Sequence, residues 1–266
     1  RDNLKSRLGD ILTADDAIYR AVLEAVSRAI DDFTGRQFRV FTATRYYSPD
    51  SQDYLPLDMG LLSVTTLKVD EDGNRTWETP WAATDYDLFP LNASADQWPY
   101  LWVQTTPDGR YIFPKALAKS VEIVGSWGWW QDLLTLTATL NEALDASETG
   151  VDVSDGTDFD VLDTILIDTE QMYVTAISAN TLTVERAING TTAATHTSGA
   201  AVKRYRYPGP VVEACAIQAV RLFRRREAPF GVTGGTDISA PRGIPELDPD
   251  VKRLLARYVA LQESFA

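Results

Sequence analysis

Residues 165–202 read ILIDTEQMYVTAISANTLTVERAINGTTAATHTSGAAV. Short runs rich in β-branched residues are separated by Asp-, Asn- and Gly-containing breaks, a pattern typical of antiparallel strands joined by tight turns. The surrounding stretch, 131–206, contains no Trp and no Pro and is rich in Thr, Ala and Asp. We therefore predict a small all-β domain of five or six strands over 131–206, with a barrel-like or sandwich-like architecture.

Strand-like sequence also precedes this stretch. The runs are FRVFTATRYYS at 38–48, SVTTLKVD at 63–70, YDLFP at 86–90 and KSVEIVGSW at 119–127. Turn-type breaks such as DEDGN at 70–74 separate them, so we predict antiparallel strands and hairpins. The tryptophans are Trp77, Trp81, Trp98, Trp102, Trp127, Trp129 and Trp130. They could form a sugar-binding platform, but we favour core and interface packing, because aromatic side chains dominate both.

A helix is predicted on the N-terminal side of these strands, over about residues 14–34. Thr13 and Asp16 have the spacing of a capping box. Gly35 fits the position just after a helix end. Apolar residues recur every three to four positions and form one stripe: Ile18, Val22, Val26, Ile30 and Phe33.

Two more helices are predicted after residue 206. Pro210 begins an almost continuously apolar segment, VVEACAIQAVRLF, so we expect most of the helix 210–226 to be buried. Residues 228–247 are rich in Gly and Pro and too long for a simple connector, which indicates a functional or mobile loop. Asp248 as N-cap and Pro249 at the first position begin a last helix, 248–262. Its apolar face is Val251, Leu254, Leu255, Tyr258 and Val259.

Composition excludes several classes of protein. The 266 residues carry a net charge of −13, which argues against a general nucleic-acid binder. Residues 131–206 alone hold 12 acidic and 4 basic residues. One Cys and one His exclude an internal disulfide framework and a His/Cys zinc site. No apolar stretch approaches the roughly 20 residues that span a bilayer. The chain starts at Arg1 without Met, so we expect residues to precede it.

The order of these elements resembles a known family. VEIVGSWGW at 121–129, the helix ending RLFRRREAPFG, a Gly-rich loop and DPDVKRLLARY at 248–258 resemble tailed-bacteriophage head-to-tail connector, or adaptor, proteins. Those proteins also begin with an amphipathic helix that ends in a Gly and an aromatic-rich strand. The family norm lacks the stretch 131–206, but residues 165–202 are similar to a small β module that recurs in phage virion proteins.

This resemblance completes the expected architecture. The expected fold class is α+β: a helical connector core with β hairpins, plus the inserted all-β domain. The expected domains are 1–130 as the first part of the core, 131–206 as the insertion and 207–266 as the second part of the core.

The resemblance also implies a function. The chain would be a structural virion protein, with no reaction and no cofactor, located at the neck of the particle and made in the bacterial cytoplasm. It would form a ring, typically twelve-fold, under the portal protein and receive the tail or a tail-completion protein. Viral double-stranded DNA would pass through the ring without sequence-specific binding, and no membrane is involved.

Several residues could carry chemistry instead. The run VDVSDGTDFD at 151–160 could bind calcium, but it lacks EF-hand spacing, so we favour a solvated turn. Carboxylate pairs could serve glycoside hydrolysis, but nothing in the sequence selects a pair. His196 would have to serve any Ser/His/Asp triad, and we interpret it as a loop residue. Cys215 is expected to be a small buried residue.

The Arg cluster at the end of the helix 210–226 is the remaining candidate site. It could contact DNA phosphates, but given the acidic chain we favour ion pairs with an acidic neighbouring subunit. The predicted subunit or portal interface comprises Arg221, Arg224, Arg225, Arg226, Val251, Leu254, Tyr258 and Phe265.

Two alternative functions stay open. One is a tail-completion or other neck protein. The other is a secreted carbohydrate-binding or hydrolytic protein, with tryptophans as the sugar platform and acidic residues as catalysts.

Overall fold

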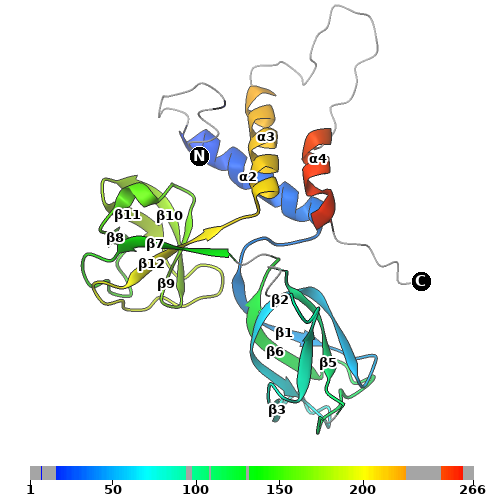
Figure 1. The fold of residues 1–266 in the computed structure, drawn as a ribbon. Coiled ribbons are helices and arrows are strands. Elements are labelled where there is room, and N and C mark those ends of the chain that lie inside the picture. The colour runs from blue at the N-terminus through cyan, green and yellow to red at the C-terminus, as the bar shows by residue number, and fades with distance from the viewer. Residues whose placement is uncertain are drawn as a thin grey trace, which may run out of the picture. The chain divides into compact units, whose positions relative to one another are not determined.

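The structure is a computed structural model that describes residue 7 and residues 16–93, 98–107, 109–129, 132–225 and 247–259. The chain divides into two compact units. The first comprises Arg1–Arg36, Phe159–Leu162 and Tyr207–Ala266, and the second comprises Gln37–Asp158 and Asp163–Arg206. The second unit contains two antiparallel sheets of six strands each, and the first contains the helices (Figure 1).

The first sheet is built from the hairpin segments before residue 130. Its strands are β1 (Phe41–Tyr47), β2 (Tyr54–Val69), β3 (Thr79–Trp81), β4 (Tyr86–Phe89), β5 (Tyr100–Thr105) and β6 (Val121–Trp127). They follow the order β1-β6-β2-β5-β4, and β3 pairs with β2. Alternation along β6 turns Val121, Ile123 and Trp127 inward, where each is fully buried. They pack with Leu55, Leu61 and Leu67 of β2 in one apolar core.

The second sheet lies in residues 132–206. Its strands are β7 (Asp132–Thr139), β8 (Gly150–Asp152), β9 (Thr164–Ile167), β10 (Glu170–Ser178), β11 (Thr181–Glu185) and β12 (Ala201–Arg206), with a short 3-10 helix, η1 (Gly156–Asp158). The strand order is β7-β12-β9-β10-β11-β8 (Figure 1). The other side of β8 meets the end of β7, because the Asn141 amide donates to the Asp152 carbonyl at 2.8 Å and the Ser154 amide donates to the Thr139 carbonyl at 2.9 Å. No described strand is shared between the two sheets.

The described α-helices, and one further 3-10 helix, belong to the first unit. They are α2 (Asp16–Thr34), α3 (Gly209–Arg225), α4 (Pro249–Leu255) and the 3-10 helix η3 (Ala256–Tyr258). Gly35 follows α2 with a φ of 64°, which confirms the predicted left-handed end of that helix. The Asp248 side chain accepts a hydrogen bond from the Asp250 amide, which confirms the predicted N-cap. The rings of Tyr19 and Phe223 lie 4.6 Å apart and join α2 to α3.

The expected fold class, α+β with a helical connector core, is wrong. Among the described residues, the protein is mostly β: twelve strands form the two sheets, and α2, α3 and α4 are short, with 19, 17 and 7 residues. Helical periodicity is a strong local signal, but it does not show where most buried residues lie. Here a cluster of eleven buried apolar side chains lies in the first sheet.

Other expectations need adjustment. α3 is not buried all round, because Val212 is 44% exposed while Ala214, Ala219 and Phe223 are buried. The last helix is shorter than predicted, because α4 ends at Leu255 and η3 continues only to Tyr258. Thr13 and the loop over 228–246 lie outside the described residues. The predicted domain boundaries stay a prediction. No helix among the described residues is long and apolar enough to cross a membrane.

Candidate functional site: a buried charge cluster and the predicted interface residues

Glu170 is the main polar residue in the interior of the second sheet. It begins β10, and the alternation of that strand turns Glu170 inward with Met172 and Val174. All three side chains are fully buried. A carboxylate at such a position is costly unless charged and hydrogen-bonding partners surround it.

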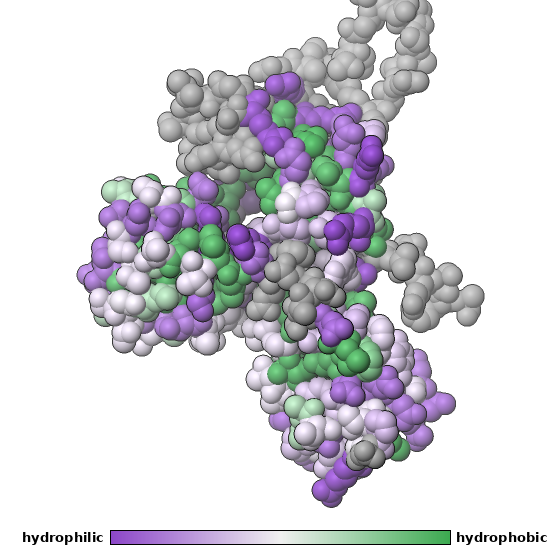
Figure 2. All heavy atoms as spheres, in the orientation of Figure 1, coloured by the Kyte–Doolittle hydropathy of each residue, from purple (hydrophilic) through white to green (hydrophobic). Residues whose placement is uncertain are grey.

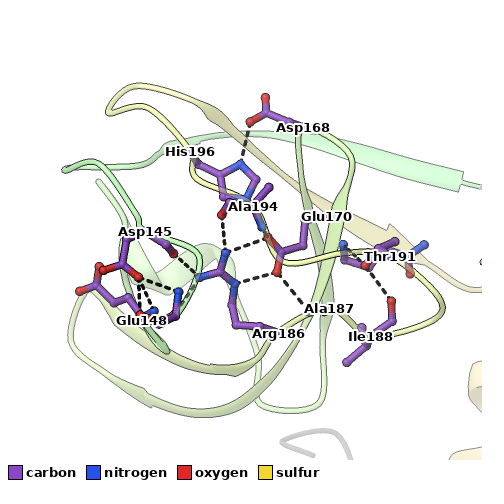
Figure 3. Close-up of polar contacts among 12 residues, drawn as sticks. Asp145, Glu148, Asp168, Glu170, Arg186, Ala187, Ile188, Thr191, Ala194 and His196 are labelled. Carbon is purple, nitrogen blue, oxygen red and sulfur yellow. Dashed lines mark hydrogen bonds and ion pairs between the residues drawn. The ribbon is translucent and has the colours of Figure 1, made fainter.

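Arg186 supplies the opposite charge (Figure 3). Its Nε and Nη2 donate to the two oxygens of Glu170 at 2.7 and 2.8 Å. Its Nη1 donates to the carbonyl oxygens of Asp145 and Glu148, both at 2.7 Å. Its Nη2 also donates to the carbonyl of Ala194 at 2.7 Å. All five N–H groups of the guanidinium are therefore used.

His196 completes the cluster. Its Nε2 lies 2.9 Å from Oε2 of Glu170, and its Nδ1 lies 2.7 Å from Oδ2 of Asp168. The ring is buried, whereas the Asp168 side chain is 62% exposed. The amides of Ala187 and Ala194 donate to Glu170 as well. We call Asp168, Glu170, Arg186 and His196 the charge cluster.

The environment of Glu170 decides its protonation. Burial alone would raise the pKa of this carboxyl group. The hydrogen bonds from Arg186, His196 and the amides of Ala194 and Ala187 outweigh burial and lower the pKa to about 2. Glu170 is therefore an anion at neutral pH.

The charge cluster has the chemistry of a scaffold. Glu170 has both oxygens occupied by donors and a low pKa, so it is a poor general base. Arg186 ties the segment 145–148 to β10 and to the segment 194–196. The two ring nitrogens of His196 contact Asp168 and Glu170, an arrangement that differs from a Ser/His/Asp triad.

Sequence reasoning missed this cluster and placed His196 in a loop. One signal was present: Glu170 shares an inward parity with Met172 and Val174, so a buried partner was required. The sequence could not predict which residue that partner would be, because Arg186 and His196 follow 16 and 26 residues later in separate segments.

Cys215 and the acidic run 151–160 were the other chemical candidates, and both make local contacts. Burial raises the pKa of the Cys215 thiol, which lies 3.9 Å from the Ser27 hydroxyl in the helical unit. A raised pKa keeps the thiol protonated and a weak nucleophile. In the run 151–160, Asp155 accepts hydrogen bonds from the amide and hydroxyl of Thr157, which is a turn geometry.

One group of carboxylates in the described chain has the spacing of a cation site. It comprises Asp70, Asp72 and Glu78, outside the run 151–160. The Asp70 carboxylate accepts hydrogen bonds from the amides of Gly73 and Arg75, and the Asp72 carboxylate accepts one from the amide of Asn74. These hydrogen bonds show that the carboxylates of Asp70 and Asp72 stabilise a tight loop between β2 and β3.

The six tryptophans that the structure describes all take part in packing. Trp127 is fully buried, and Trp81 stacks on Phe113 at 4.8 Å. The other described tryptophans also make ring contacts: Trp77 with Tyr46, Trp102 with Phe89, and Trp98 with Trp129. This supports the packing interpretation over a sugar-binding platform.

The predicted interface residues are brought together only in part. Arg221 forms an ion pair with Asp248, the N-cap of α4, and is therefore used within the chain. Arg224 is exposed at the end of α3.

The apolar members of the predicted interface lie mostly inside the chain. Val251 and Tyr258 are buried within the chain, and Leu254 is half-buried. Arg226, Phe265 and the side chain of Arg225 lie outside the described residues. A partner contact at these residues stays a prediction.

Comparison with known proteins yields two solved structures. No known family and no curated protein matches the chain. The neck of an empty GTA particle, computed with C6 symmetry, is 15% identical, aligns over 100% of this chain and 89% of its own, and has a TM-score of 0.42. The neck of a native GTA particle, computed with C12 symmetry, is 13% identical, aligns over 94% and 86%, and has a TM-score of 0.41. The neck location and the C6 and C12 symmetries describe those GTA particles and not this chain.

Proposed function

We propose that this chain is a structural protein of a virion neck. In the specific form of this proposal, it is a head-to-tail adaptor that forms a ring under the portal and joins the capsid to the tail around the DNA channel. The protein acts by holding surfaces together rather than by turning over a substrate.

One observation carries the proposal. The sequence features that resemble connector proteins are widely separated along the chain, and the helices among them pack into one unit: α2 against α3 through Tyr19 and Phe223, and α3 against α4 through Arg221 and Asp248. The stretch that departs from the family, 131–206, supplies a sheet of its own. The arrangement is the one expected when a module is added to an existing scaffold.

The charge of the chain suits a DNA conduit. A net charge of −13 repels phosphate, so DNA passing through a ring of such subunits would not adhere to the wall. Contacts with the portal protein and with the tail or a tail-completion protein belong to this proposal. Among the described residues of the predicted interface set, Arg224 is exposed and Leu254 is half-buried, and we assign these two to such contacts.

Electron microscopy of the purified full chain, alone and mixed with portal-containing capsids, tests the proposal. We expect closed rings, and added density at one vertex of the capsid. A stable monomer that leaves capsids unchanged would overturn the proposal. A chain that binds glycans and ignores capsids would favour the carbohydrate-binding alternative, and density that appears only on detached tails would favour a tail-completion role.

A further inference from the structure

Charge is divided unevenly along the chain. Residues 131–206 hold 12 acidic and 4 basic residues, whereas residues 207–266 hold 7 acidic and 8 basic residues. The acidic excess therefore lies in the β part of the protein. In the C-terminal segment, basic residues slightly outnumber acidic ones.

The basic residues of the second sheet are used internally. Arg186 pairs with Glu170 at 2.7 Å, Arg204 with Asp163 at 3.2 Å and Arg206 with Asp132 at 2.9 Å. The remaining base, Lys203, is half-buried. The surface that this sheet presents to a partner is accordingly acidic.

The acidic groups concentrate in β8 and in the segments on either side of it. Residues 142–158 contain six acidic residues and no basic ones. Glu142, Asp145 and Asp155 are exposed in this stretch, and we call these three residues the acidic edge. Hydrogen bonds from Ser147 and the Glu148 amide lower the pKa of Asp145, and bonds from Thr157 lower that of Asp155. Both carboxylates are therefore charged at neutral pH.

A complementary surface lies on α4 and η3. Lys252, Arg253 and Arg257 are exposed, and we call them the basic face. Val251 and Leu255 occupy the opposite side of α4 and are fully buried, which fixes the direction in which the basic face points. Figure 2 shows hydrophilic residues over α4. Asp248 is already paired with Arg221, so Asp250 is the acidic residue that accompanies this face in the first turn.

We infer that the basic face docks on the acidic edge of a second copy of this chain. The inference rests on the ring of the proposed function, because a ring needs a heterologous contact between two different surfaces of the same chain. Charge complementarity selects the occupant: a second copy brings the acidic edge, whereas duplex DNA would meet a chain of net charge −13. Such a contact weakens with added salt, because exposed ion pairs are screened.

Two charge-reversal variants test this contact by sedimentation velocity at low salt. The first is Glu142→Lys with Asp155→Lys, and the second is Lys252→Glu with Arg253→Glu. We expect each variant alone to associate at least about tenfold more weakly than the wild type, because like charges then meet at every contact. An equimolar mixture should associate like the wild type, because each contact between the two variants joins opposite charges again.

A matched control carries the same charge change as the first variant at another surface. Glu71→Lys with Asp87→Lys alters exposed residues in the loop between β2 and β3 and in β4, and should associate like the wild type. Far-UV circular dichroism checks that every variant is folded.

Each outcome decides one of the proposals. Variants that associate normally while the wild type forms rings would overturn this contact and leave the ring standing. A mixture that fails to recover would overturn the second copy as the occupant, since a contact within one chain, with DNA or with the portal is not restored by mixing. A wild type that stays monomeric would overturn the ring itself.

Discussion

Glu170 is a charged residue at a position where the strand pattern requires an apolar one. The protein accommodates it with a bidentate arginine, a histidine and two backbone amides rather than with water. Removing one partner of such a buried pair leaves the other charge uncompensated, which costs far more than the pair contributes in net terms.

We therefore expect Arg186→Leu to lower the free energy of unfolding of residues 132–206 by about 3–5 kcal/mol. Hydrogen exchange of the amides in β9 to β12 measures this loss. Arg206→Leu is the matched control, because Arg206 is 52% exposed in its pair with Asp132 and should cost no more than about 1 kcal/mol. Equal losses in the two variants would contradict the role of the charge cluster.

The low pKa of Glu170 makes stability depend on pH in a defined window. The folded pKa is about 2, below the ordinary value of 4.5, so the unfolded chain binds more protons between these values. The contribution of Glu170 is present above pH 4.5 and should be lost as the pH falls toward 2, by about 3 kcal/mol in total.

Glu170→Gln checks this window. The variant should be less stable at neutral pH, because Arg186 loses its counter-charge, but the difference from the wild type should shrink below pH 4.5. Hydrogen exchange at a series of pH values gives that difference. A difference that stays constant down to pH 2 would show that Glu170 does not titrate there.

At the scale of the element, Gly125 sets how closely β6 and β2 approach. It pairs with Val64 beside an irregularity in the register of these strands. A Cβ atom at Gly125 would overlap the carbonyl oxygen of Ser63. A backbone carbonyl cannot move aside as the flexible end of a side chain can, so the two strands would have to separate.

Gly125→Ala should therefore destabilise the first sheet by about 1–3 kcal/mol, the range for overpacking a tight site. Urea unfolding followed by Trp fluorescence reports on this sheet, because all the tryptophans lie between residues 77 and 130. The control is Gly150→Ala in β8, where the nearest atom would lie at an ordinary 3.8 Å. Because β8 lies in the second sheet, urea unfolding of both variants is also followed by far-UV circular dichroism. A Gly125 variant with an unchanged urea midpoint would mean that β2 can shift freely.

At the scale of the whole molecule, the two sheets share no described strand and have separate strand orders. We expect a chain in which a short Gly/Ser linker replaces 131–206, joining Trp130 to Tyr207, to keep a cooperative unfolding transition of the first sheet. Trp fluorescence in urea measures it, with the full chain as reference. Loss of cooperativity would show that residues 131–206 are integral to the rest of the fold.

Local features of this protein were determined by the sequence itself. Gly35 ends α2, Asp248 caps α4, and strands β9 to β12 occur where short β-branched runs alternate with turns. Each depends on residues within a few positions of one another, so local sterics and hydrogen bonding suffice to predict them.

Tertiary structure alone decided the rest. Strand order, the mostly β fold class, the pairing of Arg221 with Asp248 and the charge cluster around Glu170 all join residues that are distant in sequence. The physical reason is that periodicity shows that a residue faces inward but not which residue it meets there. The helices that suggested a helical core remain correct as elements, but the buried apolar cluster of the first sheet joins strands that are distant in sequence, so periodicity could not reveal it.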